Sequence, residues 1–182
     1  MTEPQFWQVV EEACQYTGNI PFQHTDLKAS HLIDTLSNFN KEDIIDFERI
    51  LQIKVIEARQ HYNVSALYEI IDGPGISDDC YLYFLYALIA QGQKIVDTAL
   101  YHPDTLAPVL EPTSDIDAEC FMYIADEAFE KRFGTSAPEE EYPRNQVEDM
   151  ELPVSSKRIG QQWEYDDLPV RFPTLWQKFK RD

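Results

Sequence analysis

The sequence predicts an all-α fold: a single-domain bundle of about six to seven helices with an extended, partly irregular C-terminal arm. Apolar residues recur at helical spacing through most of the first 134 residues. An almost unbroken apolar run from Cys80 to Ala90 is typical of a buried central helix. Beyond Gly134 the chain becomes rich in proline and charge and loses this spacing. With 182 residues, 43% of them hydrophobic, the chain is long enough to bury one core without disulfides or metals.

Polar residues predict the starts of the first three helices. Thr2 followed by Gln5 has the form of a capping box, which starts a helix expected to run to about Tyr16. Thr25 and Asn40 are the expected N-caps of the second and third helices. The third is the clearest amphipath, and its inward stripe comprises Ile44, Phe47, Leu51, Val55 and Ala58. We expect its acidic residues on the other faces, and these are Glu42, Asp43, Asp46, Glu48 and Glu57.

A central helix is predicted after a glycine-rich break. A short helix at residues 65–71 should end at the sequence GPG, after which Ser77 can cap the central helix. Asp78 and Asp79 then fall in its first turn, where carboxylates complement the helix dipole by about 0.3–1 kcal/mol each. We expect Gly92 to loosen this helix before its apolar stripe continues.

The last long helix of the body is predicted after Ser114. Its apolar residues recur at strict four-residue spacing and are Ile116, Cys120, Ile124 and Ala128. Gly134 is well placed as its C-cap. The helical body is therefore expected to cover residues 1–134.

Two further segments follow the body. Residues 135–162 are expected to form an extended arm or flexible connector. Residues 163–182 are rich in aromatic side chains, among them Trp163 and Trp176, and such side chains are costly to leave in water. This leaves two alternatives: the segment docks on the helical body, or it anchors another protein.

The acidic charge of the chain limits its partners. The formal net charge is −18, and between Gln60 and Glu130 the only Lys or Arg is Lys94, against 13 acidic residues. Such a surface repels nucleic-acid phosphates and anionic membranes, and it attracts basic proteins. Simple solubility of an acidic protein is the other explanation of this charge. We therefore expect no direct binding to nucleic acid or membranes, and a basic protein is the expected kind of partner.

The cysteines and the start of the chain predict a cytoplasmic protein. Cys14, Cys80 and Cys120 are odd in number and form no CxxC pair, which is typical of reduced thiols. The first residues show no basic leader before a long apolar stretch, so no secretory signal is expected. The apolar run in the central helix is shorter than the about 20 residues that span a bilayer. Cys80 is expected to be a small buried hydrophobe.

Five stretches carry a family resemblance: FWQVVEEA, DIIDFERIL, GISDDCYLYFLYALIAQGQ, HPDTLA and WEYDDLPVRFPTLW. Together they resemble the bacterial domain-of-unknown-function 4240 family over essentially the whole chain. The resemblance implies that the C-terminal tail belongs to the domain, and it implies no activity. The chain departs from the family pattern in the central helix, where Leu85, Tyr86 and Ala87 replace an Arg-Gly-Trp-like series.

The candidate binding residues are Ser77, Asp78, Asp79, Gln91, Trp163 and Trp176. The leading hypothesis is a non-enzymatic, acidic helical protein that acts as a protein–protein interaction or regulatory module, for example as an immunity-type inhibitor of a basic partner. It assigns no catalytic residue, metal ligand or cofactor. The alternative is a metal-assisted enzyme with Asp78 and Asp79 at its centre. That alternative requires a second acidic cluster nearby, such as Glu42, Asp43 and Asp46.

Overall fold

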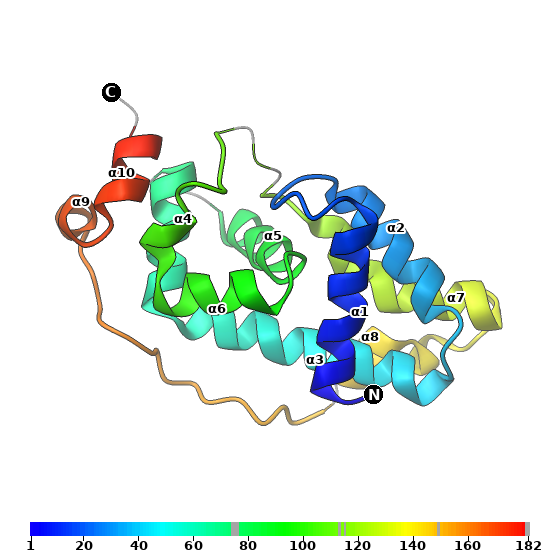
Figure 1. Cartoon of the computed structure of the whole chain (residues 1–182). Helices are drawn as coiled ribbons and strands as arrows, with labels where there is room; N and C mark the ends of the chain where they lie inside the picture. Colours follow the sequence, from blue (N-terminus) through cyan, green and yellow to red (C-terminus); the bar gives the residue numbers. More distant parts are fainter. Residues whose placement is uncertain (74–76, 113, 115, 149, 181–182) are drawn as a thin grey trace.

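The protein, as a computed structural model, is described for residues 1–73, 77–112, 114, 116–148 and 150–180. In these ranges every regular secondary-structure element is a helix, and there is no β-strand (Figure 1). The α-helices are α1 (Glu3–Tyr16), α2 (Thr25–Leu36), α3 (Lys41–Gln60), α4 (Tyr62–Asp72), α5 (Asp78–Ile89), α6 (Gln93–Tyr101), α7 (Ile124–Phe133), α8 (Pro143–Glu148), α9 (Leu168–Arg171) and α10 (Pro173–Phe179). Four 3₁₀ helices join them: η1 (Pro103–Leu106), η2 (Glu119–Tyr123), η3 (Glu139–Glu141) and η4 (Tyr165–Asp167).

The all-α class is confirmed, although the ten α-helices of the described ranges exceed the six to seven predicted. One reason is that Gly92, which was expected only to loosen the central helix, is instead the N-cap of a separate helix. Its φ of +84° is a left-handed conformation, so α5 and α6 are separate helices. The other reason is that α8 and α9 form in segments that show no sustained helical periodicity.

The buried helix α5 is the centre of the fold, and the other helices gather around it (Figure 1). Six consecutive residues of α5, Phe84 to Ile89, are at most 1% exposed. A helix that is buried on all sides needs this continuous apolar run. The longest helix, α3, contacts α5 and also α1, α4, α7 and α8. The predicted central helix and its Ser77 cap are therefore confirmed.

Several predicted helix starts are displaced. His24, with φ of +58°, is the N-cap of α2, and Thr25 is already inside the helix. The helix expected at residues 65–71 starts earlier, at Tyr62. The helix expected after Ser114 begins only at Ile124 and follows the 3₁₀ helix η2.

A local hydrogen bond explains the late start of α7. Asp117 Oδ1 accepts the backbone N–H of Glu119 at 3.2 Å, a bond that competes with the helical pattern. Ile116 and Cys120 therefore precede the α-helix, although both still pack against the core.

Residues 135–162 are only partly extended. Helix α8 packs on α3 and α7, with Pro143 and Val147 buried. After it, the described residues 150–162 run as a strap along the molecule to α9 (Figure 1). Two backbone hydrogen bonds hold this strap, from Tyr62 N to Ile159 O (3.0 Å) and from Ile159 N to Gln60 O (2.8 Å).

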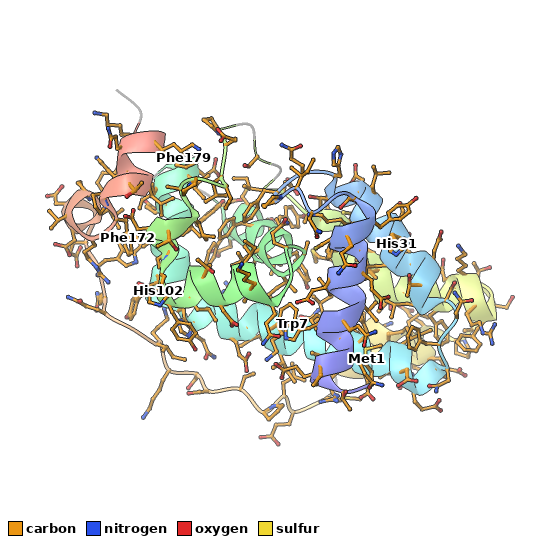
Figure 2. All side chains as sticks on the ribbon, viewed as in Figure 1. Met1, Trp7, His31, His102, Phe172 and Phe179 are labelled. Atoms are coloured by element: carbon orange, nitrogen blue, oxygen red, sulfur yellow. The ribbon has the colours of Figure 1, made fainter. Side chains whose placement is uncertain are left out.

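The C-terminal helices pack against α4 and η1. Phe172 and Phe179, both labelled in Figure 2, belong to the buried core, as does the fully buried Leu175. Asp104 Oδ1 of η1 accepts the backbone N–H groups of Thr174 (2.9 Å) and Leu175 (2.8 Å). One carboxylate thus satisfies two amides at the start of α10 that the helix itself cannot bond.

We predict that Asp104→Ala destabilises the docked α10 by about 1–2 kcal/mol, because two amide groups lose their acceptor. Hydrogen exchange should then accelerate at the amides of Thr174 and Leu175. Asp97→Ala, an exposed aspartate of α6, is the matched control and should leave that exchange unchanged. Equal protection of α10 in both variants would contradict this role for Asp104.

Candidate functional site

The predicted site residues at the start of α5 face solvent. Ser77 Oγ accepts the backbone N–H of Cys80 (3.2 Å) and donates to Cys80 Sγ (3.1 Å). Asp78 and Asp79 are exposed in the first turn. Cys80 is exposed as well, so the prediction that it is buried is wrong. This end of α5 therefore presents its charge to the surface.

The second acidic cluster that a metal site requires does not join these aspartates. Asp43 and Asp46 contact instead the N-terminal ammonium of Met1, at 2.6 and 2.5 Å. Burial would raise the pKa of Asp46, but hydrogen bonds from this ammonium and from Arg49 hold it below its usual value. Throughout the described ranges, no group of three or more His, Cys, Asp or Glu side chains is placed to hold a metal ion.

Acidic side chains and tyrosines gather where α5 begins and where α4 and η2 approach it. We call this the acidic tyrosine surface, and its residues are Tyr68, Asp72, Asp78, Asp79, Tyr83, Asp117, Glu119 and Tyr123. Tyr123 donates its hydroxyl hydrogen to Glu119 Oε1 at 3.4 Å, and Tyr68 donates to Asp72 Oδ2 at 3.3 Å. Helix α5 contacts η2 directly, which brings Asp79 of α5 and Glu119 of η2 to one place.

The pKa values of two tyrosine hydroxyl groups reflect the negative charge of this surface. Burial and the charges of Asp72 and Asp117 raise the pKa of Tyr68. Desolvation raises the pKa of Tyr83 too, and so do Glu119 and Asp79. Carboxylates of α4, α5 and η2 therefore raise the pKa values of these two tyrosines.

Gln91 lies in the turn between α5 and α6 and is 8% exposed. Its Oε1 accepts the backbone N–H of Phe22 (2.7 Å) and the ammonium of Lys28 (2.9 Å). Its Nε2 donates to Ala87 O at 2.6 Å. The carboxamide thus joins α2, the loop before it and α5, next to a cavity of about 400 Å³.

The two tryptophans among the predicted site residues are half-buried and belong to the C-terminal segment. Trp163 Nε1 donates to Tyr62 O at 2.9 Å. Trp176 packs edge-on against Tyr165, with ring centroids 5.5 Å apart. Both pack against the core, and Trp163 lies against the start of α4, the helix whose later residues Tyr68 and Asp72 belong to the acidic tyrosine surface.

A buried polar network joins α3, α5 and α8. Glu48 is completely buried, and its Oε1 accepts Gln52 Nε2 at 2.7 Å. Gln52 Nε2 also donates to Tyr86 OH at 3.0 Å. Among the described residues, Glu48 Oε2 has no hydrogen-bond partner. Arg144 of α8 acts on both Glu48 and Tyr86 and donates to Met122 O at 3.0 Å.

The network perturbs the titration of Glu48 strongly. Burial raises the pKa of Glu48 to about 7, against the smaller opposing effects of Gln52 and Arg144. Burial likewise raises the pKa of Tyr86, and the neighbouring Glu48 adds to this shift. Perturbed groups of this kind occur at functional sites and also in structural networks.

A comparison with known families decides the affiliation of the chain. The family model described as "Protein of unknown function (DUF4240)" matches residues 1–131. The chain belongs to this family. No curated protein and no solved structure matches the chain.

The DUF4240 match covers α1 to α6 and most of α7, and with them the acidic tyrosine surface and Gln91. It ends before α8, the strap and the C-terminal helices, so the expectation that the resemblance spans the whole chain is not supported beyond residue 131. Glu48, Gln52 and Tyr86 are therefore inside the family region, whereas Arg144 is outside it. None of the helices in the described ranges combines the length and hydropathy needed to cross a bilayer.

Sequence reasoning missed Glu48 and Lys28 in this DUF4240 protein. Glu48, expected on an outer face of α3, lies four residues after Ile44 and three before Leu51, which is the spacing of the buried stripe. That spacing was the signal that could have found it. Lys28 lies four residues before Leu32 and eight before Leu36, both fully buried, so the same spacing could have found it.

Proposed function

We propose that this DUF4240 protein is a non-enzymatic interaction module that binds a basic protein through its acidic tyrosine surface. The observation that carries the proposal is the gathering of Asp72, Asp79, Asp117 and Glu119 around Tyr68 and Tyr83. The half-buried Tyr83 and the exposed Tyr123 provide rigid contact area, whereas Tyr68 is buried beneath the surface. The carboxylates provide long-range attraction to a cationic partner.

The distribution of basic residues supports this choice of surface. Lys94, the single Lys or Arg between Gln60 and Glu130, follows the far end of α5. A helix of 12 residues, such as α5, is about 18 Å long, which exceeds the Debye length of about 8 Å at physiological salt. Arg59 and Arg158 act on Tyr81, whose ring lies 5.0 Å from that of Tyr68, so they border the surface on its α4 side. The carboxylates of α5 and η2 are therefore the part of the surface that supports attraction of a basic partner best.

This surface best fits the role of a regulator or of an immunity-type inhibitor. Such a protein covers a basic site on its target, and charge complementarity raises the rate of encounter. The side chains at the start of α5 contribute charge and hydrogen-bond acceptors, and the exposed Tyr123 contributes apolar contact. On this proposal the protein acts in the cytoplasm and needs no cofactor.

The test is capture of proteins from the native lysate by the full chain and by the double variant Asp79→Asn/Glu119→Gln. At about 0.1 M salt we expect the wild type to retain basic proteins that the double variant retains at least about tenfold less. At about 1 M salt, where the Debye length falls to about 3 Å, this difference should disappear.

The matched control is Glu139→Gln/Glu140→Gln, which removes the same charge from exposed residues of η3. This control should retain the same proteins as the wild type. If both double variants lose the same partners to the same extent, net charge explains the binding and the acidic tyrosine surface does not.

A further inference from the structure

The short helix α8 lies over a carboxyl group that is completely buried. Glu48 of α3 is 0% exposed, and α8 packs on both α3 and α7. Arg144 of α8 and Asp126 of α7 act on the charge of Glu48, so its carboxyl group lies close to both of these helices. An ionised carboxylate is stable in such a place only where other partners replace the water that it loses. The fit of α8 on α3 therefore depends on whether Glu48 is charged.

Helix α8 is held firmly at its start and weakly at its end. Just before the helix, Tyr142 OH donates to Glu130 Oε1 at 2.8 Å, and the backbone N–H of Arg144 donates to a carboxylate of α7 at 3.1 Å. At its end, Glu148 is exposed and pairs with Arg144 of the same helix at 3.5 Å. Among the described residues after α8, the first hydrogen bond that joins the strap to the helical body is accepted by Ser155 O. The end of α8 is therefore the part that moves most easily.

A cavity of about 180 Å³ lies between the end of α8, the start of the strap and α3. It is lined by Gln52, Arg144, Val147, Glu148, Met150 and Leu152. Its volume is large enough for several water molecules, each of which takes about 30 Å³. Gln52 connects the cavity to the buried carboxyl group, because its Nε2 donates to Glu48 Oε1 at 2.7 Å. When the end of α8 moves away from α3, this cavity gives water a path to Glu48.

The groups around Glu48 decide which of its two protonation states the docked α8 favours. The titratable and charged groups that face it are Tyr86 of α5, Asp126 of α7, and Arg144 and Glu148 of α8. Burial has the largest effect, and with the repulsion of Asp126 and Glu148 it outweighs the attraction of Arg144. The pKa of Glu48 is therefore raised from 4.5 to about 7. Docking of α8 favours the protonated side chain, and access to water favours the ionised one.

We propose that α8 is a pH-sensitive latch, which closes over Glu48 when this side chain is protonated and whose end lifts from α3 when Glu48 releases its proton to solvent. Below pH 4.5 Glu48 is protonated in both positions of α8, so the latch stays closed. The opening equilibrium rises as the pH increases from 4.5 to about 7 and then becomes constant. The latch does not rest on the proposed function, because α8 contributes no residue to the acidic tyrosine surface.

The test is hydrogen exchange of the full chain at pH 5.5 and pH 7.5, with each rate corrected for the intrinsic effect of pH on exchange. The protection of the α8 amides of Gln146 and Val147 should fall by about tenfold or more between the two pH values. The amides of the central helix α5 should stay better protected than those of α8 at pH 7.5. Equal protection of α8 and α5 at pH 7.5 means that the whole molecule opens, and it overturns the latch. A rise in the protection of α8 with pH, or no protection at either pH, overturns it as well.

Variants identify the group that titrates. Glu48→Gln has no proton to lose, so the protection of its α8 amides should differ by less than about twofold between the two pH values. Glu42→Gln, an exposed glutamate of the same helix, is the matched control and should follow the wild type. Asp126→Asn removes the carboxylate of α7 that faces Glu48 and should retain the pH dependence. Full pH dependence in Glu48→Gln, or its loss in Asp126→Asn, assigns the titration to another group and overturns the proposal.

Discussion

Glu48→Gln should make the protein more stable than the wild type by about 3 kcal/mol at pH 8, while the two should be nearly equally stable at pH 4.5. The pKa of Glu48 is raised from 4.5 to about 7 because the carboxyl group is completely buried. Within the described ranges its Oε2 has no hydrogen-bond partner. The folded state therefore holds a proton on Glu48 at pH values where the unfolded chain has lost it. Glu48 contributes most to stability below pH 4.5, and this contribution is lost as the pH rises through about 7.

The measurement is the free energy of unfolding in urea as a function of pH, compared between wild type and variant. The difference between the two curves isolates Glu48, since other shifted groups such as Asp126 remain in both proteins. Glu42→Gln, an exposed glutamate at the start of the same helix, is the matched control and should follow the wild type. Parallel curves for wild type and Glu48→Gln would show that the pKa of Glu48 is the same in the folded and unfolded states and would contradict the prediction.

Gln91→Leu should destabilise the fold by about 3 kcal/mol. The substitution removes the acceptor of the Phe22 amide and of the Lys28 ammonium while both groups stay buried. The free energy of unfolding measures the loss. Gln93→Leu, an exposed glutamine two residues further on, should change it by at most about 0.5 kcal/mol.

A double variant separates the two lost hydrogen bonds. Because the two side chains share one hydrogen bond, the loss in Lys28→Met/Gln91→Leu should be smaller than the sum of the losses in Lys28→Met and Gln91→Leu. Strictly additive losses would mean that Lys28 and Gln91 do not depend on each other. In that case the loop at Phe22 accounts for the whole effect of Gln91.

Local sequence signals predict the elements whose hydrogen bonds are local. The Ser77 cap, the Asn40 cap and the capping box at Thr2 are all present, because each depends on residues within three positions. The apolar run of α5 can be recognised as buried without knowing which helices pack against it. The fold class was predictable on these grounds.

The candidate sites depend on residues far apart in the sequence, and periodicity does not reveal these. Gln91 meets Phe22 and Lys28, which lie 69 and 63 residues earlier. Arg144 meets the Glu48 network from a short helix with no apolar periodicity of its own. Asp104 likewise meets Thr174 across 70 residues. Tertiary packing decides such pairings, so a single sequence leaves them open.

The hydrogen bonds between Asp104 and the start of α10 can form only late in synthesis on the ribosome, because the two segments are far apart in the sequence. Asp104 is made 70 residues before Thr174, which corresponds to roughly 4–14 seconds of synthesis. During that time, the faces of α4 and η1 that later contact α10 have no cover from their own chain. These two faces of the nascent protein therefore remain open to unwanted association until α10 emerges and covers them.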